Sequence, residues 1–318
     1  MGYSACMSLA ESWGYLDEVR VRVPAKINLA LCVGPRREDG YHELATVFQA
    51  VSLYDEVLAI SSEEGVTCEM KGAEAHKIGP AKQNLAWRAA ELIRSEYGVT
   101  EGVHIVVDKR IPVAGGMAGG SADAAGALLA CARLWELDAS TDDLIRLAGR
   151  LGADVPFALM GGCAVGLGRG ETLTPTLSRG TFHWVLAFSN EGLSTPDVYH
   201  RFDQLARTGD QRLGAPELPR TLMMALTSGD TSRVAGLLAN DLQPAACSLA
   251  PRLHATLTAG QEAGCLGAIV SGSGPTIAFL AADHDAAMEL AVRLSSQGVA
   301  REIQLATGPV PGATVVDP

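Results

Sequence analysis

The chain has 318 residues, of which 47% are hydrophobic and 19% charged, and its formal net charge at pH 7 is −11. This length and composition predict a folded globular protein of two domains. The acidic balance argues against a general nucleic-acid binder and against a protein that binds anionic membranes, because both need a broad basic surface. It still allows a small anionic ligand, since local lysines can serve a pocket.

The cysteines and the N-terminal residues indicate the cellular compartment in which the protein is expected. Seven cysteines are scattered without a C-x-x-C pair, so neither a zinc site nor a disulfide scaffold is indicated. Isolated thiols are typical of the reducing cytosol, and we expect a cytoplasmic protein. Residues 1–15 have no basic residue before the first apolar stretch, so we expect a loosely ordered extension rather than a secretory signal. No apolar run reaches about 18 residues, so we expect no membrane-spanning helix.

The first third of the chain reads mainly as strands. Alternating polar and apolar residues predict a half-buried strand over 18–23, and a second extended segment over 26–33 follows Pro24. Helical spacing predicts a helix over 84–97 that stops at Gly98. The other elements expected here are a loop over 34–40, strands over 41–53 and 56–60, and a strand with a loop over 65–79.

A glycine-rich stretch, K-R-I-P-V-A-G-G-M-A-G-G-S-A-D, runs from Lys109 to Asp123. The β-branched residues of 102–108 predict a strand before it, and the run from Ala124 to Trp135 predicts a helix after it. A helix start presents unpaired backbone N–H groups and the positive end of the helix dipole, which favour a phosphate. The glycines allow positive φ and close backbone approach. The stretch therefore predicts a cradle for a nucleotide triphosphate.

The same glycines also fit a plain flexible turn, because glycine loops before helices are common. The stretch is not the usual P-loop, since no Gly-Lys-Ser or Gly-Lys-Thr follows the glycines. It also departs from the dinucleotide-binding pattern. Met117 stands in place of the middle glycine, and Asp138, near the required spacing, follows a helix rather than a second strand. If the stretch binds phosphate, it therefore belongs to a phosphate-binding family other than these two.

The rest of the chain mixes helices and strands without an internal repeat, so the class is α+β with a domain boundary expected near residue 165. The expected elements are helices over 142–151 and 152–160, a glycine-punctuated strand over 163–173, a strand over 182–188, a short helix over 197–205, a loop over 208–219, helices over 220–227, 230–238 and 251–262, a strand over 266–270, a second glycine loop over 271–274, a strand over 276–280, a helix over 284–297, and a partly ordered strand in 304–317.

Three distant segments matter jointly for the chemistry. They are Pro24-Ala-Lys-Ile-Asn28 with Asp39-Gly-Tyr-His42, the central stretch, and Ser271-Gly-Ser-Gly-Pro275. Their order and residues resemble the GHMP kinase superfamily over about 21–280. Within it, Pro-Ala-Lys-Ile-Asn-Leu followed by Arg-x-Asp-Gly-Tyr-His is similar to the branch that phosphorylates 4-diphosphocytidyl-2-C-methyl-D-erythritol in the non-mevalonate isoprenoid pathway.

The resemblance implies a two-domain α+β fold. An N-terminal ATP-binding domain would span 1–165, and a C-terminal ferredoxin-like substrate domain would span 166–318, with a tail that could return to the first domain. The implied reaction transfers the ATP γ-phosphate to the 2-hydroxyl of the cytidylyl substrate, assisted by Mg²⁺. The expected partners are these small molecules, without nucleic acid or membrane, and the expected state is a monomer or homodimer. No metal ligands are assigned.

The family's catalytic residues fall on Asp154 and Lys26. Asp154 could accept the proton of the acceptor hydroxyl or orient that hydroxyl. Lys26 could hold Asp154 ionised and draw charge from the γ-phosphate. From the residues alone, Asp154 is also a good helix N-cap, with Pro156 in the turn that follows, and Lys26 reads as a solvated surface lysine.

The resemblance assigns Tyr41 and His42 to the cytidine end, where aromatic faces can sandwich the base and His42 can read its edge. Tyr199 adds another aromatic at the base, Thr195 reaches the substrate phosphate or ribose, and Asn28 bonds the methylerythritol hydroxyls. Without the resemblance, Tyr41 and His42 read as a half-buried aromatic and a polar surface residue.

The resemblance also implies the nucleotide contacts. Asn84, otherwise a plain helix cap, would lie near the adenine, and 271–274, otherwise a tight turn, would pack on the first site and help close it. The implied ATP-binding residues are Asn84, Lys109, Pro112, Val113, Ala114, Gly115, Gly116, Met117, Ala118, Gly119, Gly120, Ser121 and Ala122.

The central loop departs from the superfamily's commonest form, Gly-Leu-Gly-Gly-Gly-Ser-Ser-Asn, because it reads Gly-Met-Ala-Gly-Gly-Ser-Ala-Asp from Gly116. We therefore expect an ordinary φ at Ala118. Ser121 is left as the loop's only hydroxyl for phosphate or Mg²⁺. Asp123 can cap the helix start and would repel a close phosphate.

Two other functions are alternatives to a kinase for the cytidylyl substrate. One is a GHMP kinase for another small alcohol, such as homoserine or mevalonate, and the segment Gly40-Tyr-His42 argues against it. The other is a non-catalytic protein of the same fold that binds a metabolite or partner without turnover. The presence of both Lys26 and Asp154 argues against that second rival.

Overall fold

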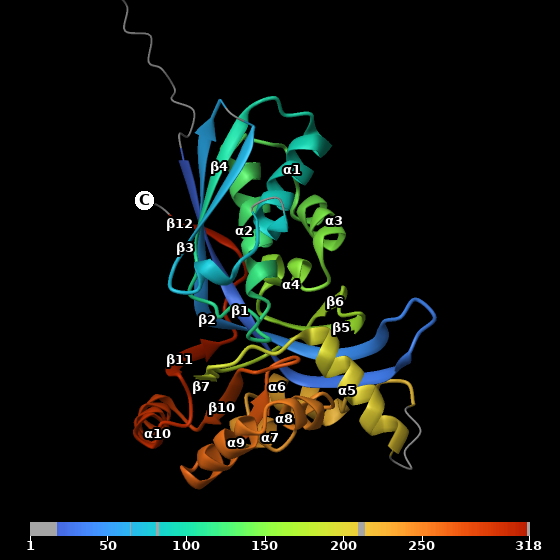
Figure 1. Ribbon diagram of the computed structural model, residues 1–318, viewed down its shortest axis with the longest axis vertical. Coiled ribbons are helices and arrows are strands. Elements are labelled where there is room, and N and C mark those ends of the chain that lie inside the picture. The colour runs from blue at the N-terminus through green and yellow to red at the C-terminus, as the bar shows by residue number, and fades with distance from the viewer. Residues whose placement is uncertain (1–17, 64, 81–82, 209–213, 317–318) are drawn as a thin grey trace, which may run out of the picture.

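The computed structural model describes residues 18–63, 65–80, 83–208 and 214–316, and the expected loose extension over 1–15 lies outside them. Figure 1 shows an elongated molecule with two parts. In the upper part a large sheet carries helices on one face, and in the lower part a smaller sheet packs against a second group of helices. The expected α+β class is confirmed.

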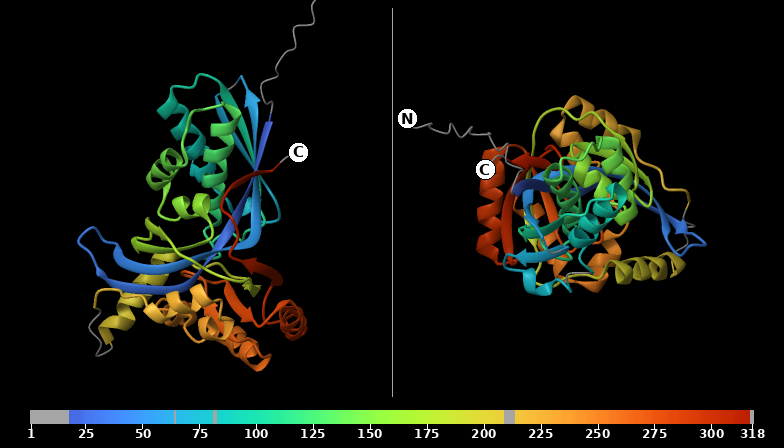
Figure 2. Two further views of the ribbon diagram at one scale, coloured as in Figure 1. Left: turned by 180° about the vertical axis from the view of Figure 1, so that it is seen from behind. Right: turned by 90° about the horizontal axis from the view of Figure 1, so that it is seen from above.

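The larger sheet is built on two long antiparallel strands, β1 (Glu18–Arg36) and β2 (His42–Ser62). The sequence predicts four shorter strands here, and this is wrong. Pro24 lies at a register shift, where a strand tolerates proline, and the pairing continues beyond it. Both strands curve across the middle of the molecule, beneath the helices of the upper part (Figure 2).

The strand order of this sheet is β12-β1-β2-β4-β3, and shorter strands extend it at the curved end of β1 and β2. The additional strands are β3 (Val66–Lys71), β4 (Gly102–Asp108), β5 (Cys163–Gly168), β6 (Thr172–Pro175), β8 (Ala239–Asn240) and β12 (Thr314–Val316). Through β12 the C-terminal tail returns to β1. The boundary expected near residue 165 falls inside β5, which pairs with β2 and β6, and it stays a prediction.

The helices of the upper part are α1 (Leu85–Tyr97), α2 (Gly119–Leu134), α3 (Thr141–Leu151) and α4 (Val155–Met160). Helix α2 is almost wholly buried and packs against β1 and β2. A Cβ atom at Gly126 would lie 2.6 Å from Cγ2 of Val57, so α2 lies very close to the sheet. This packing fixes the N-terminus of α2, into which the glycine loop leads.

The smaller sheet is antiparallel and has the order β11-β7-β10-β9. Helices α9 and α10 pack against it, as expected for a ferredoxin-like domain. Helix α8 (Gln243–Leu249) is not predicted from the sequence. The elements of this part are β7 (Phe182–Phe188), β9 (Gly267–Val270), β10 (Ile277–Ala281), β11 (Glu302–Gly308), α5 (Thr195–Thr208), α6 (Arg220–Ser228), α7 (Thr231–Ala235), α8 (Gln243–Leu249), α9 (Arg252–Glu262) and α10 (His284–Gln297), while a short 3-10 helix, η1 (Ala75–Lys77), follows β3.

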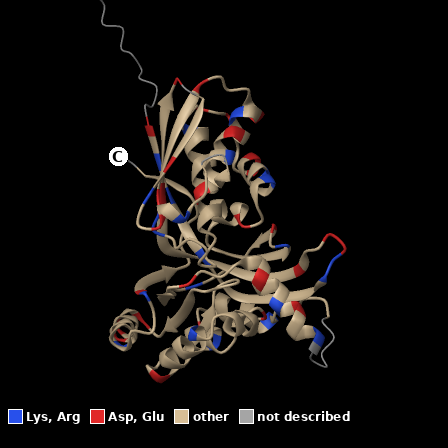
Figure 3. Ribbon diagram, viewed as in Figure 1, with Lys and Arg blue, Asp and Glu red and all other residues tan. Residues whose placement is uncertain are grey.

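Acidic and basic residues are interspersed over both parts of the molecule (Figure 3). Among the residues that the structure describes, no helix is long and apolar enough to cross a membrane. The six cysteines in the described ranges all carry free thiols.

Candidate active site

The glycine loop connects β4 to α2, as predicted, but the helix begins at Gly119 rather than at Ala124. Gly119 and Gly120 therefore form its first turn, whose amides have no partner within the helix. The loop turns through positive φ at Ala114 (54°), Gly116 (76°) and Ala118 (58°). The expectation of an ordinary φ at Ala118 is thus wrong, because this residue is the left-handed N-cap of α2.

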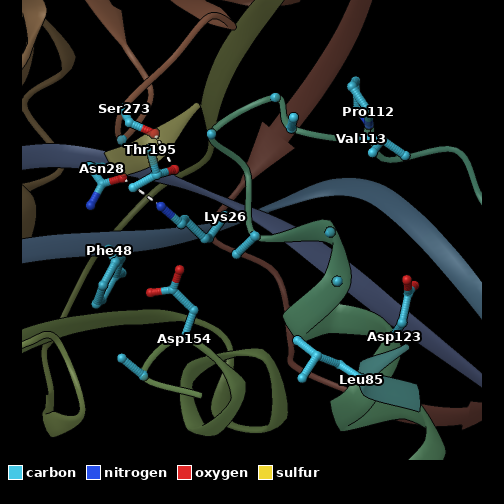
Figure 4. Close-up of a pocket in the computed structure, with 18 of the residues that line it drawn as sticks. Lys26, Asn28, Phe48, Leu85, Pro112, Val113, Asp123, Asp154, Thr195 and Ser273 are labelled. Carbon is cyan, nitrogen blue, oxygen red and sulfur yellow. Dashed lines mark hydrogen bonds between the residues drawn. The ribbon is translucent and has the colours of Figure 1, made fainter. Parts of the chain in front are cut away.

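The loop lines a central cavity of about 520 Å³ (Figure 4). The loop residues that face the central cavity are Pro112, Val113, Ala114, Gly115, Gly116, Ala118, Gly119 and Gly120. Met117, Ser121 and Ala122 are not among its lining residues, although the sequence assigns them to ATP. Met117 is buried, and its carbonyl accepts a hydrogen bond from the Lys26 amide. Ser121 is the third residue of α2.

The third segment packs directly on the glycine loop, as the resemblance implies. The Ser271 hydroxyl donates to the Gly116 carbonyl at 3.0 Å, and the Thr276 amide donates to the Gly115 carbonyl at 3.3 Å. A Cβ atom at Gly116 would lie 2.1 Å from the Ser271 carbonyl oxygen, so only glycine fits there. The segment is also a tight turn, closed by a bond from the Gly274 amide to the Ser271 carbonyl.

Lys26 and Asp154 face the same end of the central cavity (Figure 4). Lys26 is buried in β1, contrary to the alternative of a solvated surface lysine. Its Nζ donates to Oδ1 of Asn28 at 2.8 Å and lies 5.5 Å from the centre of the Phe48 ring. Burial lowers the pKa of Lys26, and the nearby Asp154 charge opposes that shift.

Asp154 occupies the N-cap position of α4, yet within the described residues its side chain makes no capping hydrogen bond. The capping role therefore does not account for its orientation. Asn28 is fixed on the other side of Lys26, because its Nδ2 donates to Thr46 Oγ1 at 2.8 Å. Thr46 in turn donates to the Ala30 carbonyl. A buried cation, a carboxylate and an amide thus line one end of the cavity.

Lys109 lies at the far end of the central cavity, between two buried carboxylates. Its Nζ bonds Asp55 and both carboxylate oxygens of Asp123, the latter at 3.1 and 3.0 Å. Asp55 also accepts from the amides of Arg110 and Ile111, at 2.6 and 2.8 Å. The sequence suggested that Asp123 could cap the helix start. It does not, because Asp123 lies one turn inside α2. Sequence reasoning missed Asp55, which directly follows an aromatic in a strand and has no local partner.

Asn84 is a helix cap, as the first of its two predicted roles requires, and its place near the adenine stays a prediction. Its Oδ1 accepts from the Ala86 amide at 2.8 Å, which caps α1, and the residue also lines the central cavity.

An outer cavity of about 650 Å³ adjoins the central one and contains the residues assigned to the cytidine. The rings of His42 and Tyr199 stack with centroids 5.3 Å apart. His42 is buried, and its ring nitrogens face the Gly34 carbonyl at 2.8 Å and Asp203 at 3.3 Å. Tyr41 is 57% exposed, with the Arg169 guanidinium 5.1 Å from its ring centre. Tyr41 and Tyr199 therefore offer aromatic surface, whereas the edge of His42 is already engaged.

Thr195 begins α5, and its hydroxyl is 2.8 Å from that of Ser273, which ties α5 to the third segment. Burial raises the pKa of Tyr199, and the Asp154 charge adds to this shift, so Tyr199 keeps its phenolic proton at neutral pH. In the described part of the chain, no group of three or more His, Cys, Asp or Glu side chains could hold a metal ion.

The arrangement is suited to phosphoryl transfer. Such a reaction needs an anion cradle, cationic groups that balance developing charge, and a carboxylate that aligns the attacking hydroxyl. The first turn of α2, Lys26 and Asp154 are groups of these three kinds, and all line one cavity.

Comparison with known proteins agrees with this geometry. The sequence-family model of the GHMP kinase N-terminal domain matches residues 84–162, and that of the GHMP kinase C-terminal domain matches residues 222–300. The chain is 53% identical to the 4-diphosphocytidyl-2-C-methyl-D-erythritol kinase of Mycolicibacterium smegmatis, over 97% of this chain and 96% of that protein. It is 54% identical to the protein of the same name from Nocardia farcinica, over 94% and 97% of the two chains.

Solved structures give the same result. A crystal structure of 4-(cytidine 5′-diphospho)-2C-methyl-D-erythritol kinase aligns with a TM-score of 0.74 and 35% identity, covering 90% of this chain and 98% of that one. Homoserine kinase from Cytophaga hutchinsonii shares the fold, with a TM-score of 0.73 at 20% identity over 95% and 98% of the chains. The chain therefore belongs to the GHMP kinases and, within them, to the family of the 4-diphosphocytidyl-2-C-methyl-D-erythritol kinases.

Proposed function

We propose that this kinase transfers the γ-phosphoryl group of ATP to the 2-hydroxyl of 4-diphosphocytidyl-2-C-methyl-D-erythritol, giving the 2-phosphate and ADP. The reaction belongs to the non-mevalonate route to isoprenoid precursors. The observation that carries the proposal is a single cavity lined by a phosphate cradle, Lys26 and Asp154. In addition, more than half of the residues of this chain are identical to those of a relative named for this activity.

ATP binds with its phosphates at the first turn of α2. The amides of Gly119 and Gly120 have no intrahelical partner, and the helix dipole favours negative charge there. Gly116 brings the loop backbone close to the third segment, and so narrows the cavity around the phosphates. Asn84 lines the part of the cavity that receives the rest of the nucleotide, whereas the Lys109 ammonium lies beside the phosphate cradle, 3.0 Å from where a Cβ atom of Gly119 would be.

Asp154 aligns the acceptor hydroxyl and accepts its proton as the bond to phosphorus forms. Lys26 lies beside it as a buried cation and offsets the charge that develops on the transferred phosphoryl group. Asn28, held by Thr46, keeps the Lys26 ammonium in place through the bond of 2.8 Å. A general base contributes about 10²–10⁴-fold, so positioning supplies much of the remaining acceleration.

The methylerythritol end binds near Asn28, and the cytosine stacks in the outer cavity on Tyr41 and Tyr199. Thr195 lies between these two regions and donates to the substrate phosphate or ribose. His42 shapes the base site through its stack on Tyr199.

Mg²⁺ bound with the ATP phosphates would supply charge neutralisation there. No group of three or more His, Cys, Asp or Glu side chains in the described ranges is placed to hold it. We place the reaction in the cytoplasm, which the free thiols support.

The deciding experiment measures ADP release with 4-diphosphocytidyl-2-C-methyl-D-erythritol, homoserine and mevalonate side by side. We expect turnover with the cytidylyl substrate and at most background rates with the other two. A clear preference for homoserine or mevalonate would identify a different alcohol kinase. Binding of ATP without turnover of any of the three would leave a non-catalytic protein of this fold.

A further inference from the structure

The central and outer cavities meet at a small set of side chains. Within the described chain, the residues that line both cavities are Leu44, Ala153, Arg169, Thr195 and Tyr199. Of these five residues, Arg169 alone carries a cationic side chain. A ligand that extends from Lys26 and Asp154 to Tyr41 therefore passes residue Arg169, whose guanidinium lies over the Tyr41 ring.

Arg169 is presented by a tight turn between β5 and β6. The flanking residues Gly168 and Gly170 both have positive φ, of 76° and 104°, which sets the direction of the turn. The guanidinium lies over Tyr41 at 5.1 Å, so the aromatic ring orients it. Its nearest carboxylate is Glu171, with Nε and Oε1 3.7 Å apart. Among the described residues the guanidinium has no hydrogen-bonded acceptor, so its donors are available to a ligand.

The other arginines of the outer cavity are engaged by the protein. Arg36 Nε donates to the Gly40 carbonyl at 3.0 Å, and Arg150 Nη1 donates to Glu96 at 2.8 Å. Neither residue lines the central cavity. Arg169 is thus the arginine whose position and free donors suit an anion at the junction.

We infer that Arg169 binds the diphosphate that links the cytidine to the methylerythritol, as a specificity-determining residue for the cytidylyl substrate. The inference rests on the proposed function, which puts the base in the outer cavity and the reacting hydroxyl at Asp154. The diphosphate then crosses the junction that the two cavities share. A planar guanidinium can donate two parallel hydrogen bonds to phosphate oxygens, and the contact with the Tyr41 ring restricts where the guanidinium lies.

The test compares Arg169→Gln and Arg169→Lys with wild type and with the control Arg146→Gln. Arg146 is a similarly exposed arginine that lines neither cavity. Binding of cytidine, CMP and CDP is measured by calorimetry, and KM is measured for ATP and for the cytidylyl substrate. For Arg169→Gln we expect CDP binding to weaken about ten-fold or more. Cytidine binding and KM for ATP should stay unchanged. Arg169→Lys keeps the positive charge but loses the paired donors of the guanidinium. Its affinity for CDP should therefore lie between those of wild type and Arg169→Gln.

Equal losses for cytidine and CDP would overturn the inference, because Arg169 would then only shape the outer cavity. A rise in KM for ATP alone would overturn it in favour of a nucleotide contact. Unchanged CDP binding in an enzyme that turns over the cytidylyl substrate would overturn the inference and leave the proposed function intact. Failure of the wild-type protein to turn over that substrate would instead overturn the proposed function, and this inference with it.

Discussion

Lys109 and Asp123 form an ion pair in the interior of the molecule, with the ammonium 3.1 and 3.0 Å from the two carboxylate oxygens. Asp55 shares the same ammonium, so two carboxylates face one cation. Burial raises the pKa of Asp123 and the Lys109 charge opposes this shift. Burial by itself would lower the pKa of Lys109, but the carboxylates of Asp123 and Asp55 together raise it. The cluster ties β2, the end of β4 and the first turns of α2 into one unit below the glycine loop.

Asp123→Asn should strengthen ATP binding. The substitution leaves Lys109 paired with Asp55 and removes one negative charge from the wall of the cavity that receives the phosphates. We expect KM for ATP to fall about five-fold, equivalent to roughly 1 kcal/mol, in steady-state ADP-release assays. An increase in KM would mean that Asp123 acts mainly by positioning Lys109.

Asp55→Asn is the matched comparison within the same cluster, and its effect should be on stability. Asp55 accepts hydrogen bonds from two backbone amides as well as from Lys109. Because the replacement disturbs a buried network, we expect the free energy of unfolding in urea to fall by about 2–3 kcal/mol. A variant as stable as wild type would show that the two amides find other partners.

Ala118→Gly should stabilise the protein. Ala118 has a φ of 58°, a conformation that costs an L-residue about 1 kcal/mol and costs glycine little. The gain is partly offset by the greater freedom of glycine in the unfolded chain, so we expect an increase of about 0.5 kcal/mol in the free energy of unfolding. The control is Ala125→Gly in the interior of α2, where the same change should destabilise the protein by about 1 kcal/mol. Destabilisation by both substitutions would contradict the left-handed assignment.

The sequence predicts much of this fold because several elements carry local signals. The helix α1 has an apolar period, a cap at Asn84 and a glycine stop at Gly98, and it is found where predicted. The start of α2 is missed because its first residues are glycine, serine and alanine, which show no apolar period. The wrong expectation of an ordinary φ at Ala118 has a related cause. This φ is imposed by the turn into the helix and not by the alanine side chain, so the local sequence does not reveal it.

The candidate site is only partly accessible to sequence reasoning. Lys26 and Asp154 are found through the family motifs, and the structure brings both to one cavity. Asp55 and Arg169 have no motif that marks them. Each gains its surroundings from tertiary contacts, Asp55 from Lys109, 54 positions along the chain, and Arg169 from the stack on Tyr41. Pairings of this kind depend on how the strands come together, and local patterns do not contain that information.

Glu74 should make stability depend on pH in the acid range. Its Oε2 accepts from the Val113 amide of the glycine loop at 2.8 Å, and its Oε1 binds Lys77 and Arg301. Burial alone would raise the pKa of Glu74, but the bonds from Lys77, Arg301 and Val113 lower it from 4.5 to about 2. The stabilisation is therefore complete above the unfolded-state pKa, near 4.5, and is lost as the pH falls towards about 2.

Urea unfolding of Glu74→Gln between pH 2 and pH 7 checks this sign. We expect the variant to be less stable than wild type by about 1 kcal/mol at neutral pH, with a difference that shrinks below about pH 4.5. Glu289→Gln is the control, because Glu289 is 74% exposed and its contact with Arg293 is 3.8 Å long. A difference that grows on acidification would be incompatible with a depressed pKa at Glu74.

Tyr41→Ala should impair binding of the cytidylyl substrate selectively. Tyr41 is exposed in the outer cavity, and stacking of a base on an aromatic ring contributes about 1–3 kcal/mol. We expect KM for that substrate to rise about ten-fold, with KM for ATP unchanged. Tyr54→Ala is the matched control, since Tyr54 also carries an arginine, Arg22, over its ring at 4.5 Å but lines neither cavity. Equal effects on both substrates would argue against a base site at Tyr41.

Asp154→Asn should stop turnover while the protein stays folded. Asparagine keeps the size and the place at the start of α4 but cannot accept the hydroxyl proton as a carboxylate does. In the described residues Asp154 makes no capping bond, so its replacement should leave the melting temperature nearly unchanged. We expect kcat to fall by about 10²–10⁴-fold, with KM for ATP within a factor of about two. Asp142→Asn, an exposed aspartate at the start of α3, is the control and should retain wild-type kcat. Near-normal turnover of Asp154→Asn would remove the general base and leave Lys26 and the helix terminus to account for catalysis.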